Sequence, residues 1–390
     1  MKKIIDTRDG VILNLVPLFA FVVFLMFCLP TFFGYFDLPI TVVNASKVAL
    51  GFLCLICIIK DMSFKEPVFY WFLFLLLNTV YFFLFQSVDE TAKGKFFSIL
   101  LVNIMFYPLY FAGRYQWLED EFFIKLFYIL LSITIFIHFH SMSNKRIDRM
   151  ADDVVVNTSY IFTYLFPFVF LIKSKLRALF ITFLMFAMVV LGAKRGALIT
   201  FVAGAFFWFI YAFLYLEGTR KNILNRFIIS QASIVISLGG VIFLLSKFSF
   251  AKQRLLTLLE GEGGSGRSLM YQNVWNGWLN ADNLINTFFG FGFSASRSFT
   301  GNNLYAHSDW LETLINFGVL GVVLYSVFWL LCFKKVFVKS INRRMKFQLL
   351  SILSICLLAS VFSMVYSAAG SASIAICLLA YLLGRIKSET

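Results

Sequence analysis

Long apolar runs alternate with short polar segments from one end of this chain to the other. A helix needs about 20 mostly apolar residues to cross the hydrocarbon core of a bilayer. The runs lack the apolar-polar alternation of membrane strands, and a helix satisfies its own backbone hydrogen bonds in lipid. The pattern therefore predicts an all-α polytopic membrane protein.

The apolar runs predict about twelve transmembrane helices. These lie near residues 11–30, 39–59, 67–86, 96–113, 121–141, 159–172, 178–193, 196–215, 227–246, 311–333, 347–366 and 371–384. The sixth and seventh runs are short and are separated only by KSKLR, which predicts tilted or partly broken helices. The basic N-terminal segment leads into a long apolar stretch without a small-residue cleavage site, so we interpret it as the first span rather than a signal peptide.

The amino-acid composition places the chain in the same class. Of the 390 residues, 60% are hydrophobic, 14% are charged and 51 are Phe. A soluble domain carries about 25% charged residues, so this chain could not cover its surface with polar groups. The formal net charge of +14 would suggest nucleic acid in a soluble protein. Here most of the excess lies in short loops between spans, so topology explains it and we expect no nucleic-acid partner.

The distribution of Lys and Arg predicts how the spans are oriented. Short loops rich in these residues face the cytoplasm. We therefore expect both termini in the cytoplasm and the longest polar segment outside it. The chain then divides into spans one to nine (1–246), an extracytoplasmic loop that contains short helices (247–310), and three further spans with a cytoplasmic tail (311–390).

Cysteine and acidic residues give no sign of a metal centre. The six cysteines all fall inside apolar runs, where a small buried apolar role explains them. Cys54 and Cys57 form a C-x-x-C, but no second ligand pair accompanies them. The pair Asp152 and Asp153 also lacks companion ligands. We predict no disulfide framework, no metal and no cofactor.

The long loop carries a predicted helix with a basic start. Ser265 in GEGGSGR is a candidate N-cap, which places Arg267 in the first helical turn. A helix N-terminus beside an arginine is a natural phosphate site. Four residues further along recur at helical spacing and therefore share one face of the helix; they are Tyr271, Val274, Trp275 and Trp278. This face is predicted to lie on the membrane surface or on the bundle. Tryptophans are also common at such positions as interfacial anchors.

Further polar positions interrupt the apolar pattern at the outer side. Lys194 and Arg195 lie in a very short turn between two spans, where the charge rule disfavours basic residues. Snorkelling to the headgroups would explain them without a function, but ionisable groups at membrane depth often mark a site. His307 directly precedes the tenth predicted span, whereas His138 lies at the end of a span, where lipid headgroups would explain it.

The order of four segments resembles the O-antigen ligase and O-antigen polymerase family of bacterial envelopes. The segments are AKRGALI, GSGR…W, FGFGFS and AHSDWLETLINFGVLGVVLY, and they cover about Arg195 to Tyr325. The resemblance implies a fold of the GT-C type and an inverting, metal-independent glycosyltransferase. It also implies an undecaprenyl-diphosphate-linked oligosaccharide donor, and a site at the outer face of the bacterial cytoplasmic membrane. This chain reads HSD where HND is common in the family.

The resemblance also implies roles for individual residues. Arg195, Arg267 and His307 match the positions that carry the family's catalytic site. On this basis the arginines would stabilise the diphosphate leaving group, and His307 would take the proton from the attacking hydroxyl. We expect substrate contacts from residues close to these three in sequence, with aromatic rings stacking on sugars and carboxylates orienting the histidine or holding sugar hydroxyls; they are Lys194, Tyr271, Trp275, Asp309 and Glu312.

The function expected from these residues is polymerisation of lipid-linked repeat units into O-antigen, capsule or exopolysaccharide. An O-antigen ligase, which moves the finished glycan to a lipid or protein acceptor, is the nearest alternative. A transporter or flippase is the alternative of another class, but such proteins usually have paired halves with broken helices, and the sequence shows no repeat. A sensor or scaffold would leave the arginines unexplained. Expected partners are the lipid-linked donor and acceptor, membrane lipids, a flippase and a chain-length regulator.

Overall fold

The computed structural model describes residues 63–84, 90–149, 155–215, 267–301, 303–366 and 371–389. Within these ranges every regular element is a helix. The spans predicted near 11–30, 39–59 and 227–246 lie outside the described residues, as do Ser265, the Asp152–Asp153 pair and the C-x-x-C. The total of twelve spans therefore stays a prediction.

The described helices follow the predicted apolar runs. In chain order they are α3 (Pro67–Leu84), α4 (Glu90–Arg114), α5 (Asp120–Arg149), α6 (Ser159–Leu165), the 3-10 helix η1 (Phe166–Leu171), α7 (Lys175–Leu191), α8 (Arg195–Tyr215), α11 (Arg267–Leu279), α12 (Leu284–Phe289), α13 (Ser296–Phe299), α14 (Asp309–Val336), α15 (Arg343–Phe362) and α16 (Ala372–Glu389). Short helices are thus present in the described part of the segment predicted to be a loop.

Length and hydropathy divide these helices into two groups. Among the described residues, 6 helices are long and apolar enough to cross a membrane, namely α3, α4, α5 up to Asn144, α8, α14 and α15. The run predicted at 159–172 is broken, because α6 gives way to a 3-10 turn where Pro167 has no N–H to donate. α7, with 17 residues, and α16 are not among those 6 helices.

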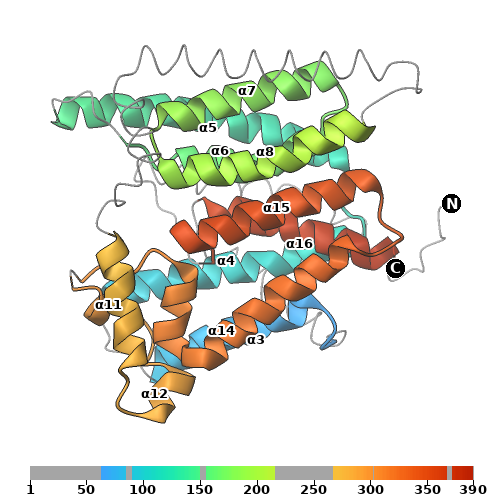
Figure 1. Cartoon of the computed structure of the whole chain (residues 1–390). Helices are drawn as coiled ribbons and strands as arrows, with labels where there is room; N and C mark the ends of the chain where they lie inside the picture. Colours follow the sequence, from blue (N-terminus) through green and yellow to red (C-terminus); the bar gives the residue numbers. More distant parts are fainter. Residues whose placement is uncertain are drawn as a thin grey trace.

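The helices pack in three layers that lie side by side (Figure 1). α5, α6, α7 and α8 form one outer layer, α4, α15 and α16 form the middle layer, and α3 and α14 form the other outer layer. The short helices α11 and α12 lie together at one end of the bundle. The lateral surface exposes large apolar side chains such as Phe83, Phe180 and Phe206, as expected for contact with lipid.

Two glycines allow the closest helix contact in the middle layer. A Cβ atom on Gly113 of α4 would collide with the backbone of Tyr381 in α16. A Cβ on Gly384 of α16 would likewise collide with the backbone of Tyr110 in α4. Small residues permit such close backbone approach between helices in membranes. α4 and α16 are therefore in direct contact along this seam.

A third glycine explains why the segment FGFGFS folds against the start of α14. Gly318 has φ 63° and interrupts α14, so the carbonyl groups just before it lose their helical donors. The Ile315 carbonyl instead accepts from the N–H of Phe291 (2.9 Å), and the Asn316 carbonyl accepts from Gly292 (3.1 Å). The first part of α14 is thereby fastened to the loop that precedes it.

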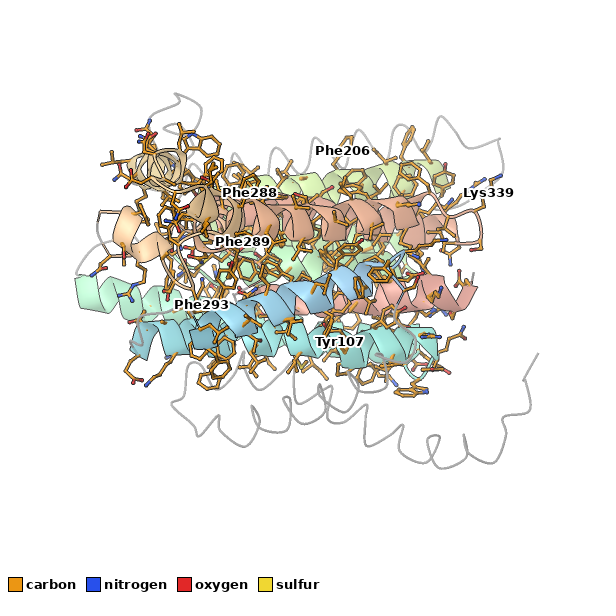
Figure 2. The ribbon with its side chains drawn as sticks, turned by 90° about the horizontal axis from the view of Figure 1, so that it is seen from below. Tyr107, Phe206, Phe288, Phe289, Phe293 and Lys339 are labelled. Carbon is orange, nitrogen blue, oxygen red and sulfur yellow. The ribbon has the colours of Figure 1, made fainter. Side chains whose placement is uncertain are left out.

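Ion pairs gather at the bundle end opposite α12. Glu66 bonds to Lys335 (2.7 Å) and to Lys387 (3.0 Å), joining residues near the ends of α3, α14 and α16. Asp120 bonds to Arg344 and Arg385 and joins α5, α15 and α16 in the same way. We call this the paired end; Figure 2 shows Lys339 there and Phe288 and Phe289 at the opposite end.

Candidate functional site

Helix α11 brings Arg267 to the bundle. α11 begins at Arg267 and buries Val274 against Ala306 and Ile315. Met270 and Trp278, one turn on either side of Val274, lie on the same face.

The predicted face of α11 holds for only part of its residues. Tyr271 and Trp278 are half-buried beside the fully buried Val274. Trp275 differs, because it is 47% exposed. One residue after Val274, it lies about 100° further round the helix. Its ring centroid is 5.4 Å from that of Trp278, so Trp275 forms the outer edge of the face.

Arg267 is anchored by groups that carry no negative charge. Its Nη1 donates to the carbonyl oxygen of Phe362 at 2.5 Å, in the last turn of α15. Its positive charge also lies close to the hydroxyl of Tyr271. The Tyr271 hydroxyl oxygen lies 3.4 Å from the carbonyl oxygens of both His307 and Val361, which share its one proton. These contacts connect α11, α15 and the segment before α14.

His307 lies beside positive charges. It has φ 55° and directly precedes the N-cap of α14. Burial lowers its pKa to about 4, and the charges of Arg267, Lys95 and Lys194 act in the same direction. The imidazole is therefore neutral near neutral pH and has a ring nitrogen available to accept a proton.

The turn that contains Lys194 and Arg195 reaches the same place. α8 begins at Arg195, and a side chain on Gly196 would collide with the hydroxyl of Tyr160 and would lie 3.6 Å from Cβ of Phe362. The backbone after Arg195 thus adjoins the residue whose carbonyl binds Arg267. Lys194 lowers the pKa of His307, so this lysine of the turn lies in the same region.

Asp309 and Glu312 are buried beneath these residues, with 0% and 1% exposure. Asp309 Oδ2 accepts from the hydroxyl of Tyr325 (3.0 Å) and from two backbone N–H groups of the segment after α15. Glu312 Oε1 accepts from the N–H of Ala306 (2.6 Å), and its Oε2 accepts from Ser296 Oγ (2.7 Å). Both carboxylates hold the loop in place, and direct contact with a sugar stays a prediction.

Sequence reasoning missed the segment in which these contacts meet. We call Phe362–Tyr366 the site turn. Four of its five residues bind three others: Phe362 O accepts from Arg267, Met364 Sδ accepts from Lys95, and the N–H groups of Val365 and Tyr366 donate to Asp309. The only signal in the sequence is the run of small and polar residues SMVYSAAGSAS, which interrupts two apolar stretches.

Lys95 was also missed, because the predicted span began one residue after it. The helix begins earlier, at Glu90, so Lys95 lies in the second turn of α4. Its ammonium is 4.4 Å from the ring centroid of Tyr305, which precedes His307 by two residues. A lysine directly before an apolar run was the available signal.

His138 does not meet the headgroups as expected. It is fully buried, and its Nδ1 lies 2.7 Å from Oγ1 of Thr158. The short helix α6, which follows Thr158, covers it, and no sequence pattern predicted that contact. His138 is accordingly a packed residue of the outer layer.

The described residues contain no group of three or more His, Cys, Asp or Glu side chains that could hold a metal ion. The side chains whose charges lower the pKa of His307 are all cationic, namely Arg267, Lys95 and Lys194. Such a set is suited to binding an anion and to accepting a proton next to it.

Comparison of the sequence with protein-family models and with curated proteins finds no match. The resemblance to the O-antigen ligase and polymerase family therefore depends on the four segments quoted above and on the chemistry of the residues in them.

Proposed function

We propose that this protein is a polysaccharide polymerase of the GT-C type. It would transfer an undecaprenyl-diphosphate-linked glycan to the terminal sugar hydroxyl of another lipid-linked repeat unit. The observation that carries the proposal is the meeting of Arg267, His307 and the Lys194–Arg195 turn around Phe362. These residues are far apart in the sequence, and their chemistry would suit such a reaction.

The leaving group explains the need for cations. As the bond between the sugar C1 and the diphosphate oxygen breaks, the electron pair stays on the diphosphate. Arg267, Arg195 and Lys194 would stabilise this growing negative charge, together with the N-terminus of α11. One well-placed donor of this kind contributes about 3–4 kcal/mol to lowering a barrier.

The acceptor hydroxyl explains the need for His307. A bond forms between the acceptor oxygen and C1, and the hydroxyl proton passes to the neutral imidazole. The products are a glycan longer by the transferred chain and undecaprenyl diphosphate. Attack from the face opposite the leaving group inverts the configuration at C1. Trp275, being 47% exposed beside Tyr271, is open to stack on a sugar ring.

The position of the site within the bundle supports an extracytoplasmic location. The opposite end carries Lys334, Lys335, Arg343, Arg344, Arg385 and Lys387 within or next to helix ends. Clusters of Lys and Arg mark the cytoplasmic side of a membrane protein. By this rule the paired end faces the cytoplasm, and the site lies at the outer face of the bacterial cytoplasmic membrane.

The direct test uses purified protein and an undecaprenyl-diphosphate-linked oligosaccharide, without added metal. Product sizing should show chains of several repeats, and Arg195→Ala should abolish them. Lys93→Ala is the matched control, because Lys93 pairs with Glu90 on the surface of α4. If well-folded wild-type protein does not elongate the glycan, the polymerase assignment is wrong. Transfer only to a lipid or protein acceptor would indicate the ligase, and uptake of the intact donor into sealed vesicles would indicate a flippase.

A further inference from the structure

Lys95 is held close to the site by weak partners. Its Nζ lies 2.7 Å from Sδ of Met364 and 4.4 Å from the ring centroid of Tyr305. A thioether is a weak acceptor, and an ammonium carries three N–H donors. The ring face adds an electrostatic attraction but uses none of these donors in a conventional hydrogen bond.

Neighbouring carboxylates do not neutralise Lys95 directly. Asp309 and Glu312 act on it electrostatically, but Asp309 Oδ2 and both Glu312 oxygens accept hydrogen bonds from other groups, and Asp309 Oδ1 is buried without a hydrogen-bond partner. Among the described residues, Lys95 forms no ion pair within 4.0 Å, whereas Lys93 on the same helix lies 2.7 Å from Glu90. A half-buried ammonium with one weak acceptor has donors available for a further ligand.

The contacts of Lys95 place it with Arg267. Lys95 bonds to Met364 of the site turn, and Arg267 bonds to Phe362, two residues earlier. On its other side, Lys95 covers Tyr305, which is two residues from His307. The cation from α4 and the cation from α11 thus meet the same turn next to the same histidine.

We propose that Lys95 is a further substrate-binding residue, which donates to a phosphate oxygen of the lipid-diphosphate donor. This inference depends on the proposed function, since it names a ligand of the same site. Lys95 would act with Arg267 and the Lys194–Arg195 turn, so that the anion is held from three helices, α4, α8 and α11. A diphosphate has enough oxygens to meet all of these donors at once.

Binding to full-length purified protein in lipid nanodiscs tests this inference. The probes are undecaprenyl diphosphate, undecaprenyl monophosphate and phosphatidylglycerol, which separate a diphosphate site from general attraction to anionic lipid. Lys95→Ala should weaken diphosphate binding by roughly ten-fold to a hundred-fold, the usual loss for a hydrogen bond to a charged group. Lys95→Arg should retain most of the affinity, and Lys93→Ala should bind as wild type.

The variants also separate this inference from the proposed function. If wild type and Arg267→Ala both fail to bind the diphosphate, the proposed function itself is overturned. If Arg267→Ala loses binding while Lys95→Ala keeps wild-type affinity, only the role of Lys95 is wrong. Equal losses for phosphatidylglycerol and the diphosphate would also overturn it. Should Lys95→Ala not fold, Lys95→Met carries the same test, because it retains the apolar stem.

Discussion

Both ends of the helix bundle hold Lys and Arg, but their partners differ. At the paired end, Glu66 and Asp120 each bind two basic side chains. At the site end, Arg267 binds a neutral carbonyl and Lys95 binds a thioether, while the nearby carboxylates accept from N–H and hydroxyl groups. Cations with acidic partners fasten helices together, whereas cations with neutral partners are available to an anionic ligand.

The largest expected effect comes from His307. His307→Ala should lower kcat by about 10²–10⁴-fold, because it removes the group that takes the proton. Product formation from the lipid-linked donor measures this, with a folding check by size-exclusion chromatography. If the variant turns over as fast as wild type, His307 has no catalytic role, and only the proposed role of the basic side chains would be left.

Arg267 should come next. Arg267→Ala should lower kcat by about 10²–10³-fold if its charge stabilises the leaving diphosphate. Arg267→Lys keeps a charge but loses the planar fork, so a partial recovery is expected. The same assay measures both variants, and a loss confined to KM would indicate equal binding of substrate and transition state instead.

Asp309 should affect stability more than chemistry. Asp309→Ala leaves three donors without their acceptor, the hydroxyl of Tyr325 and the N–H groups of Val365 and Tyr366. At 1–3 kcal/mol for each unsatisfied group, a loss of about 3 kcal/mol or more in unfolding free energy is expected. Thermal unfolding in detergent measures it. Asp309→Asn keeps an acceptor oxygen and should be destabilised less, and equal stability of all three proteins would refute this role.

The pH dependence of activity tests the effect of the cations at the site end on His307. His307 must be neutral to accept a proton, so activity should fall as pH drops through its pKa. In the free protein this pKa is lowered to about 4 by burial and by the neighbouring cations, and kcat/KM reports it. A bound diphosphate offsets those cations and raises the pKa, so kcat should begin to fall at a higher pH. Identical acid limbs in the two profiles would contradict this.

The smallest effect is expected at the paired end. Arg344→Ala removes a contact with Asp120 in which the side chains are 29% and 32% exposed. Such partly exposed pairs contribute about 0–1 kcal/mol, so unfolding should change little and activity should stay at the wild-type level. If Arg344→Ala lost as much activity as Arg267→Ala, the paired end would not have the purely structural role proposed for it.

Much of the fold could be predicted because each helix is encoded locally. Apolar runs predicted α3, α8, α14 and α15 to within about four residues, whereas α5 ends eight residues later and α4 begins six residues earlier than expected. Pro167 explains the broken sixth run. The orientation of Trp275 and the burial of His138 could not be predicted, because each depends on which neighbour covers a face.

The site was predictable only in part for the same reason. Arg267 and His307 stand out as polar residues next to helix starts. Lys95 and the site turn carry no comparable pattern, and their meeting depends on contacts between residues up to 269 positions apart. Local periodicity contains no information about such contacts.

The touching backbones of α4 and α16 have a consequence for ligand affinity. Gly113 and Gly384 let the backbones of these helices touch, which fixes α4 against α16, and the other end of α4 carries Lys95. An ammonium fixed in this way loses little freedom when a ligand arrives. A lysine that is already ordered in the folded protein loses less conformational entropy when it binds an anion. The contact of the two glycines therefore favours higher affinity at Lys95, although it lies at the other end of α4.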